Sequence, residues 1–209
     1  MMRLFKPAVF LACATPAAGM AYQLCLVLLW DQPDALGVDP VKTLEHQTGL
    51  TSLTLLFITL AITPIRRLAG LNRLQSVRRM LGVWSFVYAV LHVSAYLVFD
   101  RSCLSFEACD FAEIGNDLVK RRFIFVGMVA FTIMLVLTIT STNGWVRRLK
   151  KRWAALHRLV YVAAMAAVVH FIWIQKSNIT EPLKWAAVLA VLLGIRIYFA
   201  VKKRASARS

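Results

Sequence analysis

The 209-residue chain is 59% hydrophobic, has a mean hydropathy of +0.65 and carries a formal net charge of +15. Its apolar residues gather in long stretches that almost lack charge, which excludes an ordinary soluble domain. The basic residues lie between these stretches, where they set membrane topology and meet anionic lipid headgroups. The positive charge therefore does not indicate a nucleic-acid-binding protein.

Six apolar stretches are long enough to cross a hydrocarbon core of about 30 Å as helices. In chain order, the predicted spans are residues 8–30, 49–65, 80–99, 123–140, 153–174 and 183–201. The first begins like a signal peptide, but its apolar run is too long for one, so we expect a retained helix, kinked at Pro16. Because only short loops remain, we expect residues 1–209 to form one transmembrane domain.

The loops alternate in charge. Those after the second and fourth spans, and the C-terminal tail, are rich in Arg and Lys, whereas those after the first and third are acidic. Since positive loops remain in the cytoplasm, the sequence predicts an all-α, six-helix integral membrane protein with both termini cytoplasmic. Cys103 and Cys109 share an outer loop, where they could form a disulfide or remain free thiols.

Histidines lie inside the predicted spans, where ionisable groups suggest function. His92 is deep in the third span, and His157 and His170 lie near the two ends of the fifth. The latter two are 13 residues apart, and Arg78 precedes His92 by 14, so they form two layers separated by about 20 Å. We interpret His46, at the outer edge of the second span, as an interfacial residue.

Two facing helices that carry histidines can hold a haem, because neutral imidazole is a good axial ligand for its iron. Small residues separate the two layers: Gly82, Ser85 and Ala89 on the third span, and Ala163, Ala164, Ala166 and Ala167 on the fifth. They favour a macrocycle packed against these helices, although close helix packing in membranes also uses small residues.

The spacing on the fifth span does not fit an ideal helix. Thirteen residues leave His157 and His170 about 140° apart around the axis. We expect either an over-wound or tilted segment, or two sites on different sides of the helix. We expect no membrane-embedded carboxylate beside the histidines, which weighs against zinc and a proton relay. No P-loop or GxGxxG motif predicts a nucleotide site.

Short segments along residues 36–200 resemble the MsrQ family, formerly YedZ, in the ferric-reductase-like transmembrane superfamily. Members are haem-binding membrane subunits of bacterial periplasmic methionine sulfoxide reductase systems. Several matches fall in loops, where apolar composition does not explain them. The matching segments are LGVDPVK (36–42), His46 with Thr48-Gly49, ITP (62–64), RRMLG (78–82), LH (91–92), TST (140–142), KRW (151–153), LH (156–157), VY (160–161) and His170 with Trp173.

The resemblance implies a bis-histidine haem b at His92 and His170. A second haem would use His157, with Arg78 or its neighbour Arg79 as an unusual ligand or propionate contact, because Arg78 stands where larger relatives have histidine. FMN is also implied, but no local flavin motif is evident.

The implied role is electron transfer in the bacterial inner membrane. Electrons would pass from the quinone pool or a soluble flavin reductase to a periplasmic molybdopterin-containing methionine sulfoxide reductase, which repairs oxidised proteins. As an electron-transfer subunit, the chain would have no complete active site of its own. The alternatives are a partner-dependent ferric or quinone reductase on the same scaffold, and a non-redox transporter or assembly protein.

Overall fold

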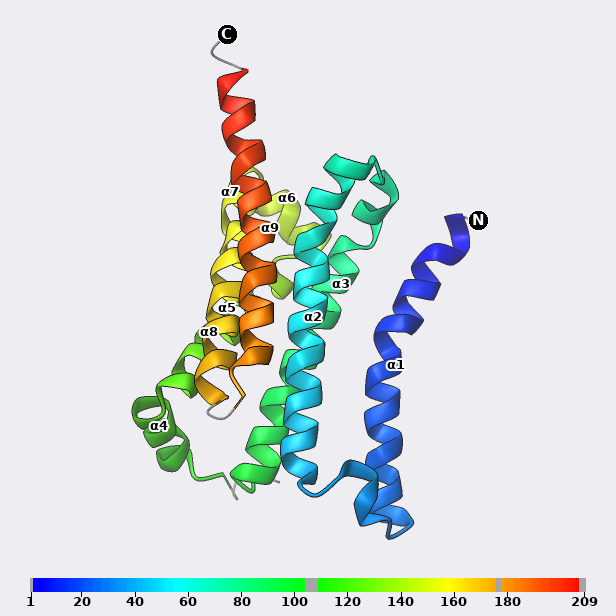
Figure 1. Ribbon diagram of the computed structural model, residues 1–209, viewed down its shortest axis with the longest axis vertical. Coiled ribbons are helices and arrows are strands. Elements are labelled where there is room, and N and C mark those ends of the chain that lie inside the picture. Colours follow the sequence, from blue (N-terminus) through cyan, green and yellow to red (C-terminus); the bar gives the residue numbers. More distant parts are fainter. Residues whose placement is uncertain (1, 104–108, 176–177, 207–209) are drawn as a thin grey trace. The chain divides into compact units, whose positions relative to one another are not determined.

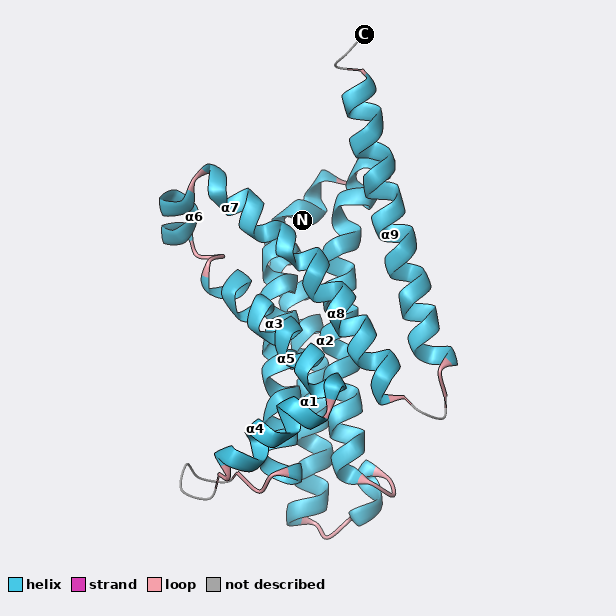
Figure 2. Ribbon diagram, turned by 90° about the vertical axis from the view of Figure 1, so that its left-hand side faces the viewer, coloured by secondary structure: helices cyan, strands magenta, loops and turns pink. Residues whose placement is uncertain are grey.

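The structure is a computed structural model that describes residues 2–103, 109–175 and 178–206. These residues form helices joined by loops, without strands (Figure 2). The longer helices are α1 (Met2–Leu29), α2 (Pro40–Ala69), α3 (Arg78–Ala95), α5 (Arg122–Ile139), α8 (Val160–Ile174) and α9 (Thr180–Ala205). The shorter ones are η1 (Pro33–Leu36), η2 (Asn72–Ser76), η3 (Tyr96–Asp100), α4 (Phe111–Lys120), α6 (Asn143–Leu149), α7 (Lys151–Leu156) and η4 (His157–Leu159).

Six helical segments in the described part of the chain are long and apolar enough to cross a membrane. They are Leu4–Leu29, Asp34–Ala69, Arg78–Asp100, Arg122–Ile139, Lys151–Ile174 and Thr180–Lys202. They match the predicted spans in order, so the all-α, six-helix membrane architecture is confirmed. The cytoplasmic location of the termini stays a prediction.

The second span differs most from its prediction, because α2 begins at Pro40 rather than near residue 49. Proline suits the first helical position, where its missing N–H is not needed. The preceding Asp39 caps the helix by accepting a hydrogen bond from the Lys42 amide at 3.1 Å, and it also pairs with the Lys42 ammonium at 2.6 Å. These local contacts extend the helix into polar sequence.

The chain forms two compact units, each described here by itself. Unit one comprises Met1–Leu56 and Ser76–Lys120, and unit two comprises Phe57–Gln75 and Arg121–Ser209. Helix α2 contributes its first part to unit one and its last part to unit two. The assignment of residues 1–209 to one domain stays a prediction.

In unit one, Tyr88 of α3 holds α1. Its buried hydroxyl donates to the Cys13 carbonyl at 2.6 Å and accepts from the Ala17 amide at 2.9 Å. Those two backbone groups are the partners of one helical hydrogen bond, so the hydroxyl bridges the turn of α1 that contains Pro16. Figure 1 shows α1 bent along its length, as expected from Pro16.

Helix α3 also packs closely against α2 through a reciprocal serine pair. Ser52 Oγ donates to the Ser85 carbonyl at 2.9 Å, and Ser85 Oγ donates to the Ser52 carbonyl at 2.8 Å. Small side chains permit this approach, and each hydroxyl finds an acceptor without water. Because Ser85 is fully buried in this contact, it serves helix packing rather than the macrocycle surface that its spacing predicted.

The acidic loop of unit one is organised around Arg101, which follows the π-helical turn η3. Arg101 forms ion pairs with Glu113 and Asp117 of α4, and Tyr96 donates its hydroxyl to Asp117 at 2.6 Å. The side chains of Arg101 and Asp117 are only 9% and 10% exposed. Cys103 and Cys109 form a disulfide, which settles the alternative that the sequence left open.

In unit two, Pro64 and Arg196 form a complementary pair. Proline has no N–H, so the carbonyl four residues earlier, that of Leu60, lacks its usual helical donor. Arg196 of α9 donates to this carbonyl at 2.6 Å and also to the Tyr161 hydroxyl of α8. Two of the guanidinium nitrogens of this charged residue within a membrane span thereby donate to protein groups. Helices α8 and α9 lie side by side in both views (Figures 1 and 2).

Candidate functional site: two histidines on backbone carbonyls

His92 of α3 is held by α2 within unit one. Its Nδ1 lies 2.8 Å from the carbonyl oxygen of Glu45, and its ring lies against Gly49. A Cβ added to Gly49 would lie 3.1 Å from Nδ1 and 3.2 Å from Cε1. The imidazole therefore rests on the bare backbone of α2.

His170 of α8 is held by α5 within unit two in the same way. Its Nδ1 lies 2.7 Å from the carbonyl oxygen of Phe123, and its ring lies against Gly127. A Cβ at Gly127 would lie 2.7 Å from Nδ1, closer than real Cβ atoms come. The Phe123 ring adds a tilted contact, with its centroid 6.3 Å from that of the imidazole.

The two arrangements repeat one pattern. Each histidine follows its acceptor residue by 47 positions, and each acceptor precedes its glycine by four. In an α-helix the carbonyl of residue i already accepts from the N–H of residue i+4. A second donor reaches that oxygen only where residue i+4 has no side chain in the way, which is the reason for glycine at both positions.

This hydrogen bond determines which ring nitrogen carries the proton. A carbonyl oxygen can only accept, so Nδ1 of each histidine is protonated and donates. The neutral imidazole then keeps its lone pair on Nε2, the nitrogen at the far end of the ring. An Nδ1–H bonded to a carbonyl is the usual orienting contact of a metal-ligating histidine, and it raises the basicity of Nε2.

His157 lies in a different setting. It begins the 3₁₀ turn η4, stacks on Trp153 with centroids 4.0 Å apart, and its Nε2 lies 3.2 Å from Thr140 Oγ1 at the end of α5. Trp153 donates to the Thr140 carbonyl at 2.9 Å, which holds the stack in place. His157 thus contacts a protein oxygen through Nε2, whereas His92 and His170 do so through Nδ1.

The over-wound segment expected in the fifth span is present as η4. Each residue of a 3₁₀ turn advances about 120° rather than 100°. Three such residues add about 60°, so the separation of His157 and His170 around the axis falls from about 140° to about 80°. The two histidines therefore come nearer to one side of the segment than an ideal helix would bring them.

Arg78 is the first residue of α3 and is partly buried, while His46 on α2 is exposed, as expected of an interfacial residue. Ala163 and Ala164 are fully buried on α8, whereas Ala166 and Ala167 are partly exposed. Of the small residues in the fifth span, Ala163 and Ala164 therefore pack against other helices, whereas Ala166 and Ala167 remain partly accessible.

An acidic residue meets His92 through its backbone carbonyl. Glu45 lies on α2, because this helix begins earlier than its apolar run, and its Oε1 is buried with no hydrogen-bond partner among the described residues. That no membrane-embedded carboxylate lies beside the histidines stays a prediction. No three His, Cys, Asp or Glu side chains in the described ranges come together as a metal-ion site.

The acceptor carbonyls and their glycines are the site components that sequence reasoning missed. Backbone carbonyls are the same at every residue, so residue type gives no signal for them. The available signal was the repeated spacing, with Gly49 and Gly127 each 43 residues before a membrane histidine.

Comparison with known proteins places the chain in a family. Residues 48–168 match the model of the ferric reductase like transmembrane component. Proteins named protein-methionine-sulfoxide reductase heme-binding subunit MsrQ are similar over 97% of this chain and 88% of their own length. The identity is 45% in Xanthomonas axonopodis pv. citri, 47% in Xanthomonas campestris pv. campestris and 41% in Herminiimonas arsenicoxydans. Both the matched domain and the near-complete coverage thus assign the chain to the MsrQ family of ferric-reductase-like membrane proteins.

Proposed function

We propose that this chain is the haem-binding membrane subunit of a protein-methionine-sulfoxide reductase system, in which His92 and His170 would hold the haem iron. The observation that carries the proposal is the shared contact of Nδ1 with a backbone carbonyl. It presents Nε2 of both imidazoles in the form that iron binds. The names of the 41–47% identical relatives support the same role.

The protein's own part in this role is to fix its ligands. The carbonyls of Glu45 and Phe123 set the tautomer and orientation of the rings, and the two glycines let the rings approach. The apolar helices around them lower the local dielectric, which influences the reduction potential. When bound, haem b supplies one-electron redox chemistry.

A second haem at the other layer would use His157, with Arg78 or Arg79 as a ligand or propionate contact. The Thr140 contact of His157 Nε2 would have to break for that nitrogen to ligate iron. We further propose the bacterial inner membrane as the location, and the quinone pool or a soluble flavin reductase as electron donor. The electron acceptor would be a periplasmic molybdopterin-containing reductase. FMN is implied by the family resemblance, and we assign it no residues.

The test is the visible spectrum of the detergent-purified full chain before and after dithionite, with haem per chain quantified. A Soret band that sharpens on reduction, with b-type α and β bands, is expected. His92→Ala and His170→Ala should each lose most of this absorbance, because each removes one axial ligand. His46→Ala is the matched control and should keep it.

A colourless wild-type protein from haem-replete cells would contradict the proposal and favour the transporter or assembly alternative. Full absorbance with an unchanged midpoint potential in His92→Ala would contradict the ligand assignment alone. A ferric or quinone reductase on the same scaffold would keep the haem spectrum. It would be separated from the proposed role by adding the purified molybdopterin reductase and measuring haem reoxidation.

A further inference from the structure

Unit one contains an open groove of about 530 Å³ along the first half of α1 and α3. Its polar lining is Lys6, Ser76 and Arg79, and its apolar lining includes Phe10, Trp84 and Val87. None of these residues belongs to the His92 contact. The groove therefore needs an explanation of its own.

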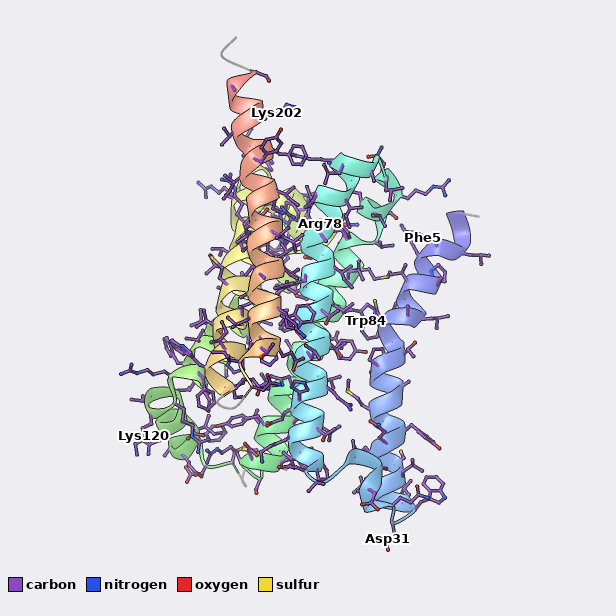
Figure 3. The ribbon with its side chains drawn as sticks, in the orientation of Figure 1. Phe5, Asp31, Arg78, Trp84, Lys120 and Lys202 are labelled. Carbon is purple, nitrogen blue, oxygen red and sulfur yellow. A yellow bond between two sulfur atoms is a disulfide. The ribbon has the colours of Figure 1, made fainter. Side chains whose placement is uncertain are left out.

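Among the described residues, α1 is held to α3 by the hydrogen bonds of Tyr88 and by one ring contact. The Tyr88 hydroxyl holds α1 at Cys13 and Ala17, beside Pro16. Phe10 packs edge-on against Trp84, with ring centroids 5.2 Å apart, and Figure 3 shows Trp84 on the side of α3 that faces α1. Beyond this ring pair, towards Lys6, the two helices are separated by the groove.

The charges of the groove are of one sign. An ammonium and a guanidinium line its polar end, together with a hydroxyl, and none of the described residues that line it carries a carboxylate. Such a group suits an anion with several oxygen acceptors, such as a phosphodiester. Basic pockets between membrane helices commonly hold anionic lipid headgroups.

The length of the groove is comparable with one leaflet. Within α3 the lining residues run from Arg79 to Val87, which are 8 residues apart, a rise of about 12 Å along the helix. Half of a hydrocarbon core of about 30 Å is slightly longer than this. A ligand with its charged head at Lys6 and Arg79 and its tail along Trp84 to Val87 would therefore lie at the depth of a lipid in a single leaflet.

We propose that this groove binds an anionic glycerophospholipid. Its phosphate would lie between Lys6 and Arg79, and one acyl chain would lie against Phe10 and Trp84. The bound lipid would fill the space left by the bend in α1 and join α1 to α3 at a second level. The proposal does not involve His92 or His170, and it leaves Arg78, rather than Arg79, for a second haem.

The test uses the full chain in micelles doped with brominated phosphatidylglycerol or brominated phosphatidylcholine, since bromine quenches nearby tryptophan fluorescence. The chain has six tryptophans, so the Trp84 signal is the difference between the wild type and Trp84→Phe. Phosphatidylglycerol should quench this signal at lower mole fraction than phosphatidylcholine. Removing each cation should weaken its apparent affinity about five-fold.

Three double variants distinguish the effect of lost charge in the groove from the effect of disturbed folding. Lys6→Gln/Arg79→Gln should lose the preference for phosphatidylglycerol, and Lys6→Arg/Arg79→Lys, which conserves charge, should keep it. Arg147→Gln/Lys151→Gln removes the same charge from exposed positions in another basic loop and should also keep it. Equal quenching by both lipids, or equal loss in the control variant, would overturn the proposal. So would stronger quenching by decylubiquinone, which would assign the groove to a quinone.

Discussion

At the residue scale, Gly49 and Gly127 are needed for the candidate site as much as the histidines are. Each glycine leaves the space in which one histidine ring lies. A glycine within a helix costs about 0.5–1 kcal/mol relative to alanine, so a gain elsewhere is expected to offset it. Here the gain is the approach of an imidazole to a helix carbonyl. The space is tighter at Gly127, where an added Cβ would lie 2.7 Å from the ring nitrogen, than at Gly49, where it would lie 3.1 Å away.

Gly127→Ala should therefore displace the His170 ring and weaken the Nδ1 hydrogen bond. We expect less haem per chain or a shifted midpoint potential, together with a lower thermal unfolding midpoint of the haem-free protein. Gly49→Ala should change the same quantities in the same direction but less. Spectroscopic haem quantification and differential scanning fluorimetry measure the two effects.

The control for both substitutions is Gly194→Ala on α9, where an added Cβ would meet nothing within 4 Å. It should leave haem content unchanged and raise stability by a few tenths to about 1 kcal/mol. If Gly127→Ala left haem content unchanged, as Gly194→Ala should, the close contact at His170 would not be needed for haem binding.

At the element scale, α2 shows how a break in one helix is satisfied by another. Pro64 deprives the Leu60 carbonyl of its helical donor, and Arg196 from α9 supplies a replacement. The same guanidinium also donates to the Tyr161 hydroxyl. It lies over the Tyr161 ring, with the guanidinium carbon 5.0 Å from the ring centroid. Arg196 is thus a structural link between α2, α8 and α9 within unit two.

Arg196→Met should lower the free energy of unfolding by about 1–2 kcal/mol, since it leaves the Leu60 carbonyl without a donor in apolar surroundings. Pro64→Ala restores a backbone N–H that can bond this carbonyl. In that background the cost of Arg196→Met should shrink, which a double-mutant cycle in detergent would measure. Lys184→Met is the control, because Lys184 is an exposed cation on the same helix as Arg196. Fully additive effects would refute the coupling between Pro64 and Arg196.

At the scale of the whole molecule, the alternating loop charges predict the orientation of the chain. Acidic residues surround Asp34 in η1, whereas basic residues fill the loop that contains Arg148. The positive-inside rule then places Asp34 outside and Arg148 in the cytoplasm.

In intact bacteria, a membrane-impermeant maleimide should label Asp34→Cys but not Arg148→Cys, in a Cys25→Ser background. Cys25 is replaced because it is an exposed free thiol, whereas Cys13 is buried. After the cells are opened, both introduced cysteines should react. If only Arg148→Cys were labelled in intact cells, the chain would have the opposite orientation to the one predicted.

The amino-acid sequence by itself determined the six spans and the histidines worth testing. Apolar length is a local property, and a bilayer forces any such stretch to satisfy its backbone as a helix. The early start of α2 escaped that reasoning, because Asp39 and Pro40 begin the helix in polar sequence. For the same reason, Glu45 was not expected beside His92.

Only the tertiary structure decided what each imidazole contacts. The Glu45 and Phe123 carbonyls lie 47 residues from their histidines, and they meet only when α2 packs on α3 and α5 packs on α8. The same holds for Ser85, which faces Ser52, and for Arg196, which reaches Leu60. Helix periodicity places a residue on a face of its own helix, but which helix covers that face depends on packing between segments distant in the sequence.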